Sequence, residues 1–195
     1  DAVVTLTNLV DGEARVRDVY SDCVLYVPYV MPGYDLAKYC ADLWAREGRD
    51  DLEGIVLLKH GMFSFGQDAR ESYERMISLV NQAEDYLRTQ GVWELSLPSE
   101  EPPSRLDAPS LAALRRSLST VAGFPMLLRA NRSPRALSFA SNQQWTDAHQ
   151  RGTATPDHVI RVKRSPLVGR DVTAYAESYG ESFSRNAAKV AGGEH

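Results

Sequence analysis

The sequence has 195 residues, a formal net charge of −4 and a hydrophobic fraction of 43%. Its length suffices for one well-buried domain and is short for two. No apolar run approaches the roughly 20 residues of a membrane-spanning helix, and no signal segment opens the sequence, so we expect no membrane partner and a cytoplasmic location. Cys23 and Cys40 are the only cysteines and form no Cys-x-x-Cys motif, which fits a reducing compartment.

The first part of the sequence predicts a sheet covered by helices. Alternating or continuous apolar residues predict strands, and apolar residues at helical spacing predict helices. Asp68 and Glu71 are placed as a capping box at the start of the longer helix. The expected fold is a three-layer αβα domain with strands at 2–7, 24–30 and 54–65 and helices at 35–46 and 68–89. Because the sequence opens at Asp1 within the first expected strand, we expect the domain to be N-terminally truncated.

A proline-rich stretch, 98–109, is the one convincing linker. It separates an expected domain at 1–97 from a smaller α/β portion at 110–195. In that portion we predict a helix capped by Ser110 and closed by Gly123, and a last helix capped by Asp171. The remaining expected elements are strands at 126–128 and 159–162, a short helix at 143–150 and an ambiguous segment at 137–140.

Charge is distributed unevenly. Residues 1–104 carry 9 Lys and Arg against 19 Asp and Glu, whereas residues 105–170 carry 11 against 3. The basic region indicates phosphate binding or an acidic partner surface, or packing against the acidic part of the same protein, which is the simpler interpretation. Its arginines alternate with prolines and aliphatic residues rather than aromatic ones, so we do not expect nucleic acid as a partner.

His60 is the leading candidate for a functional residue. It follows the apolar run 54–58, which has the composition of a strand buried on both faces, and Gly61 permits a tight turn after it. A histidine held rigidly at the end of such a strand can present its imidazole as a metal ligand. An isolated histidine is nevertheless more often structural than a ligand, so the residues around it decide.

The segment Leu57-Leu58-Lys59-His60-Gly61-Met62-Phe63-Ser64-Phe65-Gly66, with the helix that follows, closely resembles the class II aldolase/adducin family. The upstream segment Pro28-Tyr29-Val30-Met31-Pro32-Gly33 resembles the same family's strand-to-helix passage, and the resemblance covers about residues 1–90. Lys59 stands where the family usually has asparagine.

The resemblance implies a zinc site. Active members of the family hold zinc with three histidines, two of them in a His-x-His pair on an earlier strand, and an upstream acid assists. His60 matches the third histidine, whereas the pair and the acid would lie before Asp1. The implied reaction is aldol cleavage of a ketose such as a dihydroxyacetone phosphate derivative. We therefore expect His60 to be a metal ligand, the site in this chain to be incomplete, and the chain alone to be inactive.

A narrower resemblance covers residues 154–164. This segment resembles part of long bacterial proteins that join rhamnulose-1-phosphate aldolase-like and short-chain alcohol dehydrogenase domains. NAD would then belong to a dehydrogenase domain that this chain does not contain. His158 and Arg161, with Asp157 beside them, could line a pocket for an anion or a sugar phosphate, although a charged surface turn explains them more simply.

These observations predict part of a zinc-dependent aldolase that cleaves a phosphorylated deoxyketose or a related sugar acid. The family's cyclic tetramers and an uncovered sheet edge further predict a homo-oligomer. The alternative is a non-catalytic interaction module, since adducin shares the fold without the aldolase reaction.

Overall fold

The structure is a computed structural model that describes residues 1–94, 107–141, 148 and 150–191. The chain separates into two compact units. The described residues of the first are 1–94 and 151–164, and those of the second are 107–141, 148, 150 and 165–191. Residues 151–164 thus pack with the first unit although they lie within the basic region of the sequence.

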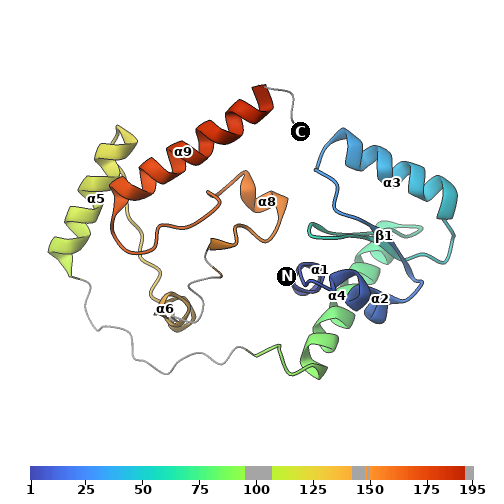
Figure 1. The fold of residues 1–195 in the computed structure, drawn as a ribbon. Coiled ribbons are helices and arrows are strands. Elements are labelled where there is room, and N and C mark those ends of the chain that lie inside the picture. Colours follow the sequence, from blue (N-terminus) through green and yellow to red (C-terminus); the bar gives the residue numbers. More distant parts are fainter. Residues whose placement is uncertain (95–106, 142–147, 149, 192–195) are drawn as a thin grey trace. The chain divides into compact units, whose positions relative to one another are not determined.

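A three-stranded mixed sheet forms the centre of the first unit (Figure 1). The strand order is β1-β2-β3, with β1 parallel to β2 and β2 antiparallel to β3. The elements of this unit are α1 (Ala2–Thr7), α2 (Gly12–Tyr20), β1 (Val24–Val27), α3 (Tyr34–Glu47), β2 (Gly54–Leu57), β3 (Gly61–Ser64), α4 (Ala69–Thr89) and α8 (Pro156–Val159). The mixed α/β character expected from the sequence is confirmed.

Alternate side chains of the sheet enter two separate hydrophobic clusters, because successive residues of a strand face opposite sides. On one face Val24 and Val56 pack with residues of α1, α2 and α4. On the other face Leu25, Ile55 and Leu57 pack with α3. All four residues of β2 are buried, so helices cover this strand on both sides.

Two of the strands expected in the first part of the sequence differ from the structure. Residues 2–7 form the helix α1, because Ala2, Val3, Leu6 and Thr7 are buried at helical spacing against the sheet and α4. The expected strand 54–65, with a break at His60-Gly61 after which it resumes, is a hairpin, in which β3 turns back along β2 with Leu57 opposite Gly61.

The helix α4 begins as the sequence indicates. The Asp68 side chain accepts a hydrogen bond from the Glu71 backbone N–H at 2.8 Å. The Glu71 carboxylate in turn accepts from the Gln67 backbone N–H at 2.6 Å, one residue before the cap. Both acids therefore satisfy backbone donors near the helix start.

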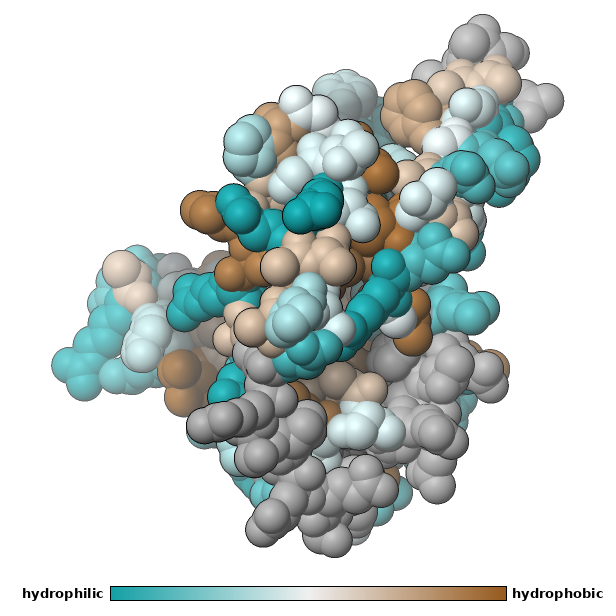
Figure 2. Space-filling model, turned by 90° about the vertical axis from the view of Figure 1, so that its left-hand side faces the viewer, coloured by the Kyte–Doolittle hydropathy of each residue, from teal (hydrophilic) through white to brown (hydrophobic). Residues whose placement is uncertain are grey.

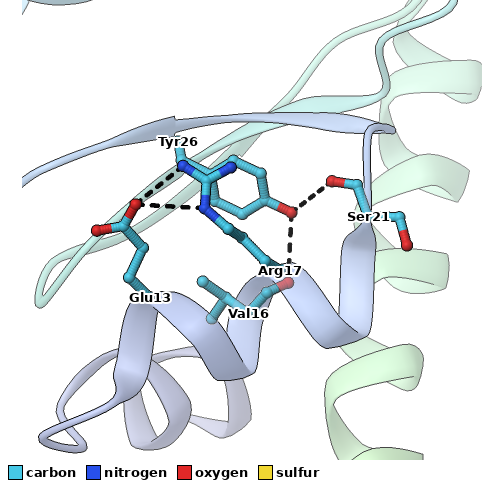
Figure 3. Close-up of polar contacts among 5 residues, drawn as sticks. All are labelled: Glu13, Val16, Arg17, Ser21 and Tyr26. Atoms are coloured by element: carbon cyan, nitrogen blue, oxygen red, sulfur yellow. Dashed lines mark hydrogen bonds and ion pairs between the residues drawn. The ribbon is translucent and has the colours of Figure 1, made fainter.

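Tyr26 connects β1 to the preceding helix α2 (Figure 3). Its hydroxyl donates to the Ser21 carbonyl at 2.6 Å, and the Arg17 guanidinium lies 4.2 Å from the centre of its ring. Arg17 is held in turn by Glu13, one helical turn earlier. Burial is the main cause that raises the pKa of Tyr26 to about 12.

In the second unit, the described residues form helices and no strand. They are α5 (Ala108–Ala122), α6 (Pro134–Ser141) and α9 (Val172–Ala191), and α5 packs against α9. The smaller α/β portion expected from the sequence is therefore helical where it is described. Figure 2 views the molecule from the side on which α5 lies in Figure 1. On this face hydrophobic residues, in brown, lie between hydrophilic residues, in teal.

The caps of this unit follow the sequence in part. Gly123 closes α5 with φ +77°, a backbone conformation that favours glycine, and the Asp171 carboxylate accepts from the Ala174 N–H at the start of α9. The start of α5 differs, because the residue at its cap position is Asp107 and not Ser110. The ambiguous segment 137–140 is helical within α6.

Neither of the two strands expected in this portion is formed, and both lie within the described residues. Residues 126–128 are irregular, and the expected strand 159–162 is replaced by the one-turn helix α8 and the turn after it. A proline at the first position of α8 fixes its backbone for a helical turn. The expected helix 143–150 and linker 98–109 lie largely outside the described residues, and the linker stays a prediction. No described helix combines the length and apolar character needed to cross a membrane.

Candidate functional site

His60 lies in the three-residue turn that joins β2 to β3. The Leu58 N–H donates to the Val27 carbonyl at 2.9 Å, which continues the β1 ladder past the end of β2. The His60 N–H donates to the Leu57 carbonyl at 3.1 Å and closes the turn. The backbone of His60 is thereby fixed to the buried centre of the sheet, as the sequence predicted.

The conformationally demanding position of this turn is Lys59. Its φ is +62°, in the left-handed region that non-glycine residues other than asparagine and aspartate rarely enter. From the sequence, Gly61 is expected to permit the tight backbone after His60, but Gly61 has no positive φ. The turn also explains why asparagine suits position 59, since asparagine tolerates the left-handed region better than lysine does.

The two ring nitrogens of His60 have different surroundings. Nδ1 is buried and has no hydrogen-bond partner among the described residues. Nε2 lies 3.9 Å from Oδ1 of Asp157, and the histidine side chain keeps 20% of its surface exposed. Since Nδ1 is sealed from solvent, Nε2 is the nitrogen that an incoming ligand can reach.

Asp157 reaches His60 because residues 151–164, which we call the strap, pack against the first unit. The Asn8 side chain donates to the Ala154 carbonyl at 2.8 Å and ties the strap to the end of α1. Thr155 is buried and occupies the cap position of α8, and Asp157 follows it in that helical turn. The carboxylate itself is 79% exposed.

The other predicted site residues of the strap do not contact His60 in any interaction of the described residues. Nδ1 of His158 lies 2.6 Å from the Thr155 hydroxyl, so this nitrogen is already occupied. Arg161 is exposed, and its backbone N–H donates to the His158 carbonyl at 3.0 Å. A role for His158 and Arg161 in binding an anion stays a prediction.

A metal ion would find an imidazole nitrogen and a carboxylate oxygen at this place, and both are common zinc ligands. The described residues contain no group of three or more His, Cys, Asp or Glu side chains that could hold a metal. The donors present therefore suit a divalent metal in chemical type and supply two of the three or four protein ligands that zinc takes.

The sequence gives no sign that Asp157 lies beside His60. The two residues are 97 positions apart and belong to segments with different patterns, so no local periodicity connects them. The segment 154–164 draws attention to Asp157 only as a neighbour of His158, in a candidate anion pocket separate from His60.

A second candidate is a groove of about 950 Å³ in the second unit. One face of α5 and residues 123–125, 127 and 128 line it, with Arg115 and Arg116 among mainly apolar side chains. The Arg115 Nε–H donates to the Met126 carbonyl at 2.8 Å and so helps to hold the groove wall. The groove contains none of the predicted site residues.

Both cysteines are free thiols. Cys23 packs beside the cluster under α1, α2 and α4, and Cys40 packs on the α3 side. Burial is the first cause that raises the pKa of each thiol, and the charge of Glu53 adds to it at Cys23. A raised pKa lowers the fraction of reactive thiolate, so neither cysteine has the character of a nucleophile.

Two family models match the chain. Residues 2–87 match the Class II Aldolase and Adducin N-terminal domain, and residues 105–194 match the second domain of class II aldolases. The first match contains His60, and the second contains the strap with Asp157.

Two individual proteins are similar to the chain. An uncharacterized oxidoreductase of Bacillus subtilis, YuxG, is 27% identical over 175 residues, which are 86% of this chain and 25% of that protein. The chain thus spans about a quarter of the length of this relative. The N-terminal class II aldolase domain of a conserved protein from Thermoplasma acidophilum is 33% identical, with a TM-score of 0.40, over 45% of this chain and 39% of that chain.

Proposed function

Because the chain belongs to the class II aldolase and adducin family, we propose that it is part of a zinc-dependent aldolase. The proposed substrate is a phosphorylated deoxyketose of the rhamnulose-1-phosphate type or a related sugar acid. The observation that supports the proposal is the placement of His60, which is fixed at the end of the buried strand β2 with Nε2 accessible.

In this proposal His60 binds the metal through Nε2. Its backbone is held by the β1 and β2 ladders, so the ring would be positioned before the metal arrives. When bound, zinc supplies a Lewis acid that stabilises the negative charge developing on substrate oxygens as the carbon–carbon bond breaks. Two described donors leave the coordination incomplete, and the proposal assigns the missing ligands to residues outside this sequence.

The proposal extends to a longer protein with a second activity. The relative of which this chain spans a quarter carries the name oxidoreductase. We propose that the whole protein joins the aldolase part to an NAD-dependent short-chain dehydrogenase. Self-association into a homo-oligomer belongs to the same proposal, and light scattering tests it directly.

The test compares His60→Ala with the unchanged protein expressed from the complete reading frame. Zinc content after dialysis and aldol cleavage should both be lost, while the dehydrogenase activity of the same chain should persist as an internal control. His158→Ala is the matched histidine control, because its Nδ1 is already occupied by Thr155, and it should retain zinc. Unchanged zinc in His60→Ala would contradict the ligand assignment.

An interaction module of the adducin type is the second candidate. It is favoured by the small number of donors at the site, since the described residues bring only His60 and Asp157 together. A complete protein that folds, holds no zinc in its unchanged form and cleaves no ketose phosphate would support this candidate over the aldolase.

A further inference from the structure

We propose that Asp157 is a further residue of the cation site at His60, delivered by the strap from the second domain of the family. This inference rests on the proposed function, because it takes His60 as the first ligand. It adds a carboxylate that neither sequence motif nor family match places at the site.

The first argument is the position of the carboxylate relative to the accessible nitrogen. Oδ1 of Asp157 lies 3.9 Å from Nε2 of His60. Bonds from zinc to nitrogen and oxygen are each about 2.0–2.2 Å, and two donors of a tetrahedral zinc lie roughly 3.4 Å apart, so a shift of about half an ångström would bring both side chains onto one ion. The same separation is too long for a direct hydrogen bond, so the imidazole and the carboxylate do not use each other as hydrogen-bond partners.

The second argument is the anchoring of the strap. A carboxylate on a freely moving segment would seldom lie near His60, whereas the Asn8 bond to Ala154 and the burial of Thr155 hold the residues just before Pro156. Anchoring raises the effective concentration of the carboxylate at the first ligand. The bond from Asn8 to the Ala154 carbonyl is therefore part of the arrangement.

The third argument concerns charge. Among the described residues no lysine or arginine forms an ion pair with Asp157, and its side chain is largely exposed. The carboxylate is thus available to a divalent cation without first breaking an ion pair. A double positive charge attracts it more strongly than a neutral imidazole does.

The test uses this chain, titrated with Co²⁺ as a spectroscopic substitute for zinc. Affinity is measured from the Co²⁺ absorption, and the amide signals of residues 60 and 157 are followed by NMR. Four variants are compared with the unchanged chain: His60→Ala, Asp157→Asn, Asn8→Ala, and the control Asp50→Asn. Asp50 is an exposed acid of the same unit near the opposite end of β2, so it reports the effect of losing one negative charge.

We expect Co²⁺ to perturb residues 60 and 157 together in the unchanged chain and in Asp50→Asn. Asp157→Asn should weaken binding by about 10-fold or more, the loss that follows removal of a supporting group at a metal site. His60→Ala should abolish the perturbation at residue 157. Asn8→Ala should weaken binding in the same direction without removing a donor.

The outcomes separate the two proposals. Loss of binding in His60→Ala with unchanged or tighter binding in Asp157→Asn would overturn the role of Asp157 and leave the role of His60 intact. Unchanged binding in His60→Ala would overturn both. Absence of any Co²⁺ effect at residue 157 in the unchanged chain, at millimolar metal, would also overturn the inference.

Discussion

Replacing Lys59 by glycine should stabilise the first unit, because Lys59 occupies a left-handed backbone conformation in the turn that carries His60. Its φ is +62°. For an L-residue with a side chain this conformation costs about 1–2 kcal/mol. Glycine removes that cost. It also lowers the free energy of unfolding by roughly 0.5–1 kcal/mol, because the unfolded chain gains conformational freedom. The net gain in the free energy of unfolding should be about 0.5–1 kcal/mol.

Two further substitutions at the same position sharpen the test. Lys59→Asn should also stabilise the turn, because asparagine enters the left-handed region several-fold more often than other side chains. Lys59→Val should lower stability by about 1 kcal/mol or more, because a β-branched side chain is a steric outlier there. The three variants remove the same charge, so charge alone predicts no difference between them.

The control is Lys38→Gly. Lys38 lies within α3 and forms an exposed ion pair with Asp42, one helical turn away. Glycine inside a helix costs about 1 kcal/mol relative to alanine, so this variant should lose stability. A gain at position 59 with a loss at position 38 would show that backbone conformation, and not loss of a lysine, decides the sign.

The assay is urea unfolding followed by circular dichroism, with the free energy obtained by linear extrapolation. Equal slopes among the variants would show that the surface exposed on unfolding is the same in each. If Lys59→Gly and Lys59→Val were equally stable, the left-handed conformation of residue 59 would be refuted, and with it the geometry assigned to the turn.

Three other predictions concern the same unit. Leu79→Ala should lower the free energy of unfolding by about 3–5 kcal/mol, because Leu79 is fully buried in the cluster between α4 and the sheet; a loss below about 1 kcal/mol in urea unfolding would contradict that packing. Asp68→Ala should cost about 0.5–2 kcal/mol through loss of its bond to the Glu71 N–H, whereas Asp68→Asn should cost less. Tyr26 has a folded-state pKa of about 12 against 10.0 for the free group, so its contribution to stability is complete below pH 10 and is lost as pH rises to 12. Tyr26→Phe should flatten that alkaline loss in a pH series of urea unfolding, and an unchanged slope would count against it.

The sequence by itself determined the elements whose signals are local. The helices α3 and α4 have apolar residues at helical spacing, and Asp68 caps the second of them where the capping pattern placed it. The strand β2 is a short continuous apolar run and is buried on both faces, as its composition indicates. His60 at the end of that strand follows from the same local pattern.

Tertiary structure decided the elements for which two local patterns compete. Residues 2–7 contain β-branched side chains that favour a strand, yet they form α1 because a helix buries four of its six residues against the sheet and α4. The run 54–58 is continuously apolar and residues 61–65 are again largely apolar, so the local pattern could not reveal that the chain reverses around Lys59 and pairs β3 with β2.

The pairing of His60 with Asp157 depended on tertiary structure altogether. Each residue has a clear local setting, one after a buried strand and the other in a helical turn that begins with proline. They approach to 3.9 Å where residues 151–164 pack with the first unit, held there by the Asn8 bond to the Ala154 carbonyl and the burial of Thr155. Contacts between residues 97 positions apart are set by packing and hydrogen bonding across the fold, which leave no periodic signal in the sequence between them.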